Sequence, residues 1–316
     1  MTEKSIIVIG AGIAGLATGC YAQVNEYRTR IFERHTLPGG LCTSWRRKGY
    51  TFDGCIHWLI GAGSGSGLHA IWQELGAVQD RPMVFHEEFI RFQTSDKQPF
   101  IVYTNIDRLE RHMKGRFPAD ALLIEEYARA ARRFTHIDLF ALPLLKPTEA
   151  LRILPFAGSL GRWGRLTMQG FADRLRDPFL RRVFPLIHGH PPLPMAAHLA
   201  NLAAWHTRSA GWPVGGSLQF SRAIERRYRD LGGEIRYGSR VERILVERGP
   251  RRRPRSHQAV GIRLGDGTEH YADVIVSAGD GYTTIFHMLG GDYVNDQICG
   301  YYDAAPSGQE HGVLVS

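Results

Sequence analysis

Three closely spaced glycines near the amino terminus, Gly10, Gly12 and Gly15, constrain the fold more than any other feature of the sequence. The four residues before them, 6–9, are all apolar, which is typical of a buried parallel strand. From Ile13 onward, apolar and small residues recur at helical spacing. In a strand, turn and helix of this kind, the first glycine permits the turn, the second admits a pyrophosphate, and the third lets the helix pack on the strand. The sequence therefore predicts a dinucleotide site at a helix N-terminus, whose free N–H groups face the phosphates.

A carboxylate occurs where this fold holds a ribose. A second short strand, 29–32, ends in Glu33, about 20 residues after the glycines. In dinucleotide-binding folds a carboxylate at this position accepts hydrogen bonds from ribose hydroxyls. The alternative is an ordinary solvated acid at a strand end, and the order of strand, glycines, helix, strand and acid disfavours it.

A glycine pair, Gly39 and Gly40, follows Glu33 and bears on which dinucleotide is bound. Its backbone N–H groups would lie on the flavin side of the pyrophosphate. A nicotinamide-dependent dehydrogenase would also carry Glu33 but would seldom need this pair. The pair therefore favours a flavin dinucleotide.

Two longer blocks carry a specific resemblance. The first is Pro38-Gly39-Gly40 followed by Gly49-Tyr50-Thr51-Phe52-Asp53, and the second runs from Pro213-Val214-Gly215-Gly216-Ser217 to Val276-Ser277-Ala278. They resemble the phytoene desaturase, carotenoid isomerase and retinol saturase branch of the FAD-dependent amine oxidase superfamily, over the whole chain and in order. The resemblance implies an α/β fold: a Rossmann-like FAD-binding domain (a parallel sheet plus a β-meander) with an inserted α+β substrate domain.

The resemblance also implies the residues that contact FAD. It places His57 close to the flavin and the backbone of Val241 at the adenine. The expected set is Gly10, Gly12, Ile13, Ala14, Gly15, Glu33, Arg34, Gly39, Gly40, Leu41, His57 and Val241. Leu41 departs from the family, which usually has arginine there, so Arg46 or Arg47 would have to supply that contact. No catalytic residue is predicted and no metal site, since His188 and His190 lack accompanying carboxylates or cysteines.

The order of the elements predicts two domains, with the chain passing from one to the other and back. A crossing is expected near residue 85 and a return at Trp212, after which Ser217 is expected to cap a helix that runs to Leu231. The ranges are 1–84 and 212–290 for the FAD-binding domain, 85–211 for the substrate-binding or cap domain, and 291–316 for a truncated return to it.

Relatives of this kind run well beyond 316 residues and close over the flavin with a later glycine-rich segment, so a fragment is expected, ending in the apolar run 312–316.

Charge and apolar segments restrict the partners. The formal net charge is +8, partly from the basic run 248–255, which lacks the interleaved aromatic residues of a nucleic-acid site and is expected to be a solvated loop. The segment 137–166 mixes apolar and basic residues, which suits either an interfacial membrane contact or a lid over an apolar pocket. No apolar run reaches the roughly 20 residues of a spanning helix, and no leader is recognisable. The expected location is cytoplasmic, with a peripheral contact on the inner face of the membrane as an option.

The four cysteines form no Cys-x-x-Cys pair and are interpreted as free thiols: Cys20, Cys42, Cys55 and Cys299. Cys42 and Cys55 lie beside the expected flavin, but the favoured interpretation is that each is a small hydrophobic residue.

The activity that these features favour is that of an FAD-dependent oxidoreductase. It would act on carbon–carbon bonds of an apolar isoprenoid or carotenoid-type substrate by desaturation, isomerisation or saturation, with the protein orienting the substrate and excluding water. The alternatives are a flavin amine oxidase, a nicotinamide-dependent dehydrogenase, and an inactive fragment that binds no cofactor well.

Overall fold

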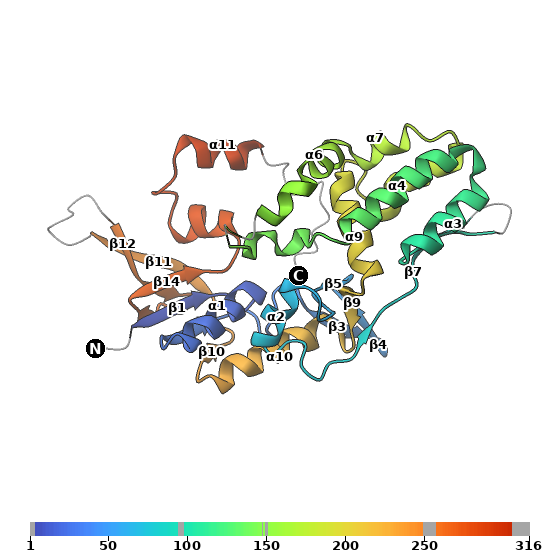
Figure 1. Ribbon diagram of the computed structural model, residues 1–316. Helices are drawn as coiled ribbons and strands as arrows, with labels where there is room; N and C mark the ends of the chain where they lie inside the picture. The colour runs from blue at the N-terminus through green and yellow to red at the C-terminus, as the bar shows by residue number, and fades with distance from the viewer. Residues whose placement is uncertain (1–3, 94–97, 147, 149–150, 249–256, 305–316) are drawn as a thin grey trace. The chain divides into compact units, whose positions relative to one another are not determined.

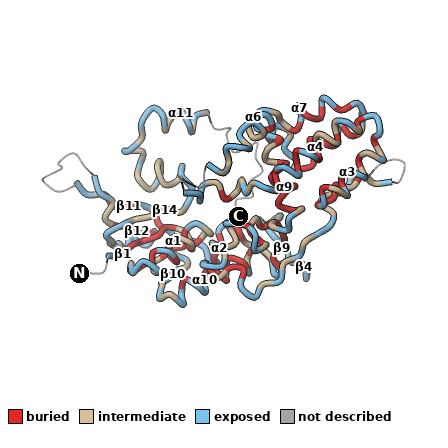
Figure 2. Tube along the Cα trace, in the orientation of Figure 1, coloured by how far each residue is buried: buried red, intermediate tan, exposed pale blue. Residues whose placement is uncertain are grey.

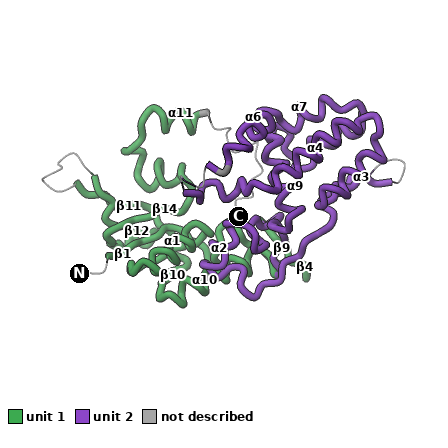
Figure 3. Tube along the Cα trace, viewed as in Figure 1, with its two compact units in different colours: residues 1–55, 215–316 green, residues 56–214 purple. Residues whose placement is uncertain are grey.

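The computed structural model describes residues 4–93, 98–146, 148, 151–248 and 257–304. The chain forms two compact units, residues 1–55 with 215–316 and residues 56–214 (Figure 3). The chain therefore passes from one unit to the other after Cys55 and returns after Val214. The sequence patterns predicted these crossings near residues 85 and 212. Strand pairing explains the difference, because β5 (Leu59–Ile60) and β6 (Met83–Val84) both pair with β9 (Ala210–Pro213) within the second unit.

The first unit is built on a parallel sheet of four strands (Figure 1). Their order is β10-β2-β1-β14, and their bounds are β1 Ser5–Ile9, β2 Arg28–Phe32, β10 Glu234–Arg236 and β14 Val274–Ser277. Ile9 lies opposite Phe32 on one side and Ser277 on the other. The carboxyl ends of three strands therefore meet at one edge of the sheet.

Two helices and a β-meander pack on the sheet. The helices are α1 (Ile13–Val24) and α10 (Gly216–Asp230), and the meander strands are β11 Val241–Arg248, β12 His257–Leu264 and β13 Glu269–Tyr271. Gly19 lets α1 approach closely, since a Cβ there would lie 2.7 Å from the Tyr228 ring of α10 and 3.0 Å from Ile31 of the sheet. Phe32, whose side chain points to the opposite face from that of Ile31, packs in one cluster with Ile244 of the meander. These layers confirm the predicted Rossmann-like domain with a parallel sheet and a β-meander.

The remaining helices and strands among the described residues of the first unit are a hairpin and two short helices. The hairpin is formed by β3 (Ser44–Arg47) and β4 (Tyr50–Asp53), and the helices are a π-helix at Thr283–Met288 and α11 at Asp296–Ala304. Lys48 and Gly49 turn the hairpin with φ angles of 49° and 82°, as a two-residue type I′ turn requires. The apolar run 312–316 and residues 249–255 of the basic run lie outside the described residues.

The second unit mixes helices with short antiparallel strands. Beside β5, β6 and β9 it has a hairpin, β7 Glu88–Phe92 with β8 Phe100–Tyr103. Its α-helices are α2 Gly67–Glu74, α3 Ile106–Arg116, α4 Ala121–Phe134, α6 Ala157–Arg165, α7 Met168–Ala172, α8 Pro178–Val183 and α9 Met195–His206. Short 3₁₀ segments occur at Pro118–Asp120, Leu139–Leu144, Leu151–Phe156 and Phe184–His188. The buried residues of this unit concentrate along α4 and α9 (Figure 2), so the predicted α+β insert has its own core.

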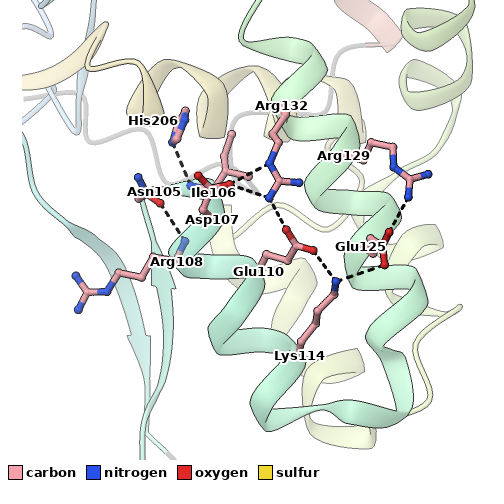
Figure 4. A network of polar contacts seen from close by, with 10 residues as sticks. All are labelled: Asn105, Ile106, Asp107, Arg108, Glu110, Lys114, Glu125, Arg129, Arg132 and His206. Carbon is pink, nitrogen blue, oxygen red and sulfur yellow. Dashed lines mark hydrogen bonds and ion pairs between the residues drawn. The ribbon is translucent and has the colours of Figure 1, made fainter.

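Polar contacts hold the helices of the second unit together at the surface and in the core. On the surface, Arg132 of α4 pairs with Asp107 and Glu110 of α3 (Figure 4). In the core, the Tyr127 hydroxyl is 2.7 Å from Nε2 of His198, whose Nδ1 is 2.9 Å from Nε2 of His188. The described residues contain no cluster of side chains suited to a metal ion and no helix that could span a membrane.

Candidate functional site

The glycine loop leaves the carboxyl end of β1 and turns directly into α1. Gly10 has a φ of +99°, and its N–H donates to the Phe32 carbonyl oxygen at 2.8 Å. A Cβ on Gly15 would lie only 1.9 Å from the Gly10 carbonyl oxygen, so no larger residue fits without separating the helix from the strand. A Cβ on Gly12 would meet nothing nearer than the Gly39 carbonyl oxygen at 4.0 Å. Gly12 therefore faces open space that a side chain would fill.

Glu33 points toward this loop and is almost fully buried. Its Oε2 accepts the N–H of Ala11 at 2.6 Å, and its Oε1 accepts the N–H of His35 at 2.8 Å. Each carboxylate oxygen has a second lone-pair direction, so the group can hold the loop and accept from another donor as well. The carboxylate thus lies at the carboxyl edge of the sheet, beside the glycines.

The glycine pair that follows Glu33 lies against the same loop. The Gly39 N–H donates to the Ala11 carbonyl oxygen at 2.8 Å, and a Cβ on Gly40 would lie 3.3 Å from the Cα of Gly12. Gly39 is buried and has a φ of +110°, while Gly40 is exposed and has a φ of +59°. The two glycine-rich segments, about 30 residues apart in the sequence, form one backbone surface.

The β3–β4 hairpin and α10 are joined by hydrogen bonds next to the glycine pair. Oδ2 of Asp53 accepts the Ser217 N–H at 2.7 Å, and Oδ1 accepts the Ser217 hydroxyl. The predicted capping role of Ser217 is wrong, because the helix begins at Gly216 after Gly215, which has a φ of +93°. Asp53 satisfies the helix N-terminus instead. The hydroxyl of Ser221, one turn further along α10, donates to the Cys42 carbonyl oxygen at 2.6 Å.

Four further expected FAD contacts are Arg34, Leu41, Val241 and His57. Arg34 and Leu41 are exposed in the first unit, and the Leu41 side chain is 67% exposed. Val241 begins β11 and is buried in the cluster that contains Phe32. His57 is exposed and belongs to the second unit, so its position at the cofactor stays a prediction.

The structure adds a third segment to this edge that the sequence analysis did not include among the cofactor residues. β14 pairs with β1, and the Ala278 N–H donates to the Ile9 carbonyl oxygen at 3.0 Å. Ala278 and Gly279 then pass beside Gly10, and a Cβ on Gly279 would meet nothing within 4 Å. The signal in the sequence was the apolar run 274–276, which is followed by three small residues, 277–279.

The residues at this edge fit the diphosphate and ribose of a dinucleotide. The first turn of α1 contains no acidic side chain, and its N-cap residue, Gly12, has no side chain to occupy the free N–H groups. A diphosphate at Gly12 would meet these N–H groups and the positive end of the helix dipole. Glu33 would accept from the ribose hydroxyls. For the diphosphate, the fit rests on the open space at Gly12 rather than on a charged side chain.

Comparison with known proteins also indicates a dinucleotide-binding domain. Residues 8–75 match the family model of an NAD(P)-binding Rossmann-like domain. The solved structure of an oxidoreductase from Methanosarcina mazei superposes with a TM-score of 0.60 at 20% identity, covering 95% of this chain and 64% of that one. The chain therefore carries a Rossmann-like dinucleotide-binding domain in an α/β fold.

The sequence relatives are more specific. The chain is 27% identical to a lycopene-forming phytoene desaturase of Paracoccus sp. over 91% of its own length and 57% of the relative. It is 25% identical to the chloroplastic prolycopene isomerase of Arabidopsis thaliana over 90% of its own length and 49% of the relative. The chain is a homologue of these phytoene desaturases and prolycopene isomerases, and the predicted resemblance is confirmed. It spans about half the length of the curated relatives it matches.

Proposed function

We propose that the chain binds FAD at the edge formed by the glycine loop, Glu33 and the glycine pair. The observation that carries the proposal is the open face of Gly12, which is backed by α1 and flanked by Gly40. The diphosphate would lie on this face and the ribose at Glu33. The buried Val241 and the exposed Arg34 and Leu41 would complete the adenine and flavin ends. A flavin, when bound, supplies hydride transfer, and the residues of this chain bind and orient it.

We further propose that the substrate is an apolar isoprenoid of the carotenoid class and that the reaction changes its carbon–carbon bonds. Support comes from the relatives, which are named for phytoene desaturation and prolycopene isomerisation. His57, in the second unit, would contribute at the flavin. The change at the carbon–carbon bonds is a desaturation, an isomerisation or a saturation.

We propose that the second unit makes a peripheral membrane contact through four exposed leucines of the segment 137–166. Leu144, Leu145, Leu151 and Leu154 are 48%, 36%, 63% and 66% exposed. Large exposed apolar side chains that recur in one segment together with basic residues favour an interface rather than open solvent. Such a contact would give the chain access to a substrate dissolved in the inner face of the membrane. Sedimentation with liposomes of anionic lipid should carry down the wild type and leave a Leu151→Asp, Leu154→Asp variant in solution.

The experiment on cofactor and activity uses the purified 316-residue chain. Bound flavin should give visible absorbance that bleaches on reduction, and the loaded protein should convert detergent-dispersed phytoene or prolycopene. Turnover of amines instead would assign a flavin amine oxidase. A colourless protein that takes up NAD but not FAD would assign a nicotinamide-dependent enzyme. A chain that takes up neither is an inactive fragment, and the proposal is then wrong.

A further inference from the structure

Two cysteines meet at the base of the β3–β4 hairpin. The strands pair as far as Ser44 opposite Asp53, and just beyond them the Gly54 N–H donates to the Thr43 carbonyl oxygen at 2.9 Å. Cys42 precedes Thr43 and Cys55 follows Gly54, so this bond brings the two cysteines close to each other. The ladder stops there, because the Thr43 N–H donates to the Leu41 carbonyl oxygen at 2.9 Å. A disulfide requires Cα atoms about 4.4–6.8 Å apart, which residues flanking such a bonded pair can reach.

The two thiols also lie close enough to affect each other's pKa. Burial raises the pKa of the Cys42 thiol to about 11, and the neighbouring Cys55 contributes to that rise. Partial desolvation raises the pKa of the Cys55 thiol, while the Cys42 side chain opposes the shift. Cys42 is buried and Cys55 is exposed.

We propose that Cys42 and Cys55 form a redox modification site that a small disulfide of the glutathione class converts to an intramolecular disulfide. The exposed Cys55 thiolate attacks the small disulfide and releases one thiol. Cys42 then attacks the Cys55 sulfur and releases the second. Two protein thiols are oxidised, and one disulfide molecule is reduced to two thiols.

The raised pKa values determine how this site behaves. Only thiolates attack disulfides, so the reaction is slow at neutral pH and accelerates as pH rises toward the pKa values. Thiols of high pKa are also poor leaving groups, so the disulfide, once formed, resists reduction. The pair is thus a slow sensor of sustained oxidation rather than a fast catalytic dithiol.

The disulfide would act on the neighbouring glycine pair. The Cys42 N–H donates to the Gly39 carbonyl oxygen at 2.9 Å, and the Cys42 thiol donates to the Ser217 carbonyl oxygen at 3.6 Å. Bridging Cys42 to Cys55 would close the segment 42–55 into a loop and restrict the turn that carries Gly39 and Gly40. Loss of chain entropy in the unfolded state would raise the Tm.

The test uses the full chain without added flavin, so its outcome is independent of the proposed cofactor. The protein is incubated with oxidised glutathione at pH 7.0 and at pH 8.5, then alkylated and digested. We expect the intact mass to fall by two hydrogen atoms, faster at pH 8.5, and the peptides carrying Cys42 and Cys55 to be joined. Trypsin separates those peptides by cleaving after Arg47 and Lys48.

Two variants and a control complete the test. Cys42→Ser should accumulate a glutathione adduct on Cys55, because the second thiol is missing, whereas Cys55→Ser should form no disulfide. Cys299→Ser should behave as the wild type. Absence of the joined peptides at pH 8.5, a bridge that involves Cys20 or Cys299 instead, or stable glutathione adducts on the wild-type Cys55 would each overturn the proposal.

Discussion

The carboxylate of Glu33 accepts the Ala11 N–H at 2.6 Å, which ties the end of β2 to the glycine loop at the end of β1. The same side chain accepts the His35 N–H, so both oxygens serve backbone donors in a nearly buried position. Glu33 therefore shapes the loop in addition to its proposed role at the ribose.

Replacing this carboxylate by an amide should destabilise the first unit. In Glu33→Gln the amide NH₂ faces one of the two backbone donors, and a buried N–H loses its acceptor, at a cost of about 1–3 kcal/mol. Urea denaturation measures the change in the free energy of unfolding. Glu234→Gln is the matched control, since Glu234 is exposed on the adjacent β10 and should change stability by less than about 0.5 kcal/mol. Equal stability of the two variants would contradict the structure.

Gly15 and Gly12 should respond differently to the same substitution. Gly15→Ala places a Cβ 1.9 Å from a backbone oxygen, and overpacking of this kind costs about 3 kcal/mol. Gly12→Ala meets only ordinary contact and has a φ of −67°, so its free energy of unfolding should stay within about 0.5 kcal/mol of the wild type. Thermal and urea denaturation of both variants check the contrast. A Gly15→Ala protein as stable as Gly12→Ala would show that α1 does not pack on β1 as described.

Asp53 should stabilise the start of α10. Asp53→Ala removes the acceptor for the Ser217 N–H and hydroxyl and should cost about 1–2 kcal/mol, as for the loss of an N-cap. Asp53→Asn keeps one acceptor oxygen and should lose less. Denaturation curves for the two variants show which one loses more stability. A larger loss in Asp53→Asn than in Asp53→Ala would be inconsistent with the capping contact.

The buried histidines should make the second unit sensitive to acid. Burial lowers the pKa of His188 to about 4 and lowers that of His198 well below its usual value. A histidine that is neutral when folded and protonates more readily when unfolded contributes stability above the unfolded pKa of about 6.5. That stability is lost as pH falls from about 6.5 to 4, by at most about 3 kcal/mol for His188.

Denaturation measured across this pH range tests the prediction with a nearby control. His188→Gln should lower stability at pH 8 and flatten its dependence on pH. His190→Gln, two residues away and exposed, should leave the pH dependence unchanged. An unaltered slope in His188→Gln would mean that this residue is not the acid-sensitive group.

The parts of the fold that the sequence predicted are those specified by local chemistry. The glycine loop follows from Gly10, which has a φ of +99°, and from Gly15, where a Cβ would lie 1.9 Å from a backbone oxygen. The expected activity came from the resemblance. The sequence relatives confirm the resemblance, and the activity stays a proposal.

The parts that the sequence did not predict depend on contacts between distant segments. The unit boundaries follow from β9, which pairs with strands about 130 and 150 residues earlier in the chain. No local sequence pattern predicts pairing between segments so far apart. The bond between His188 and His198 depends on how α9 packs, so His188 and His190 could be judged only by their spacing. The start of α10 was misassigned because Asp53, far away in sequence, satisfies the helix N-terminus.

The most direct test of the central claim is a titration of the purified chain and its Gly12→Ala variant with FAD, followed by calorimetry or by flavin fluorescence. The variant should remain folded, with unchanged circular dichroism, and should bind FAD at least about tenfold more weakly, a loss of about 1.4 kcal/mol, because its Cβ occupies the space proposed for the diphosphate. Saturable binding by the wild type together with this loss would support the site. Equal affinity of the two proteins for FAD would contradict it.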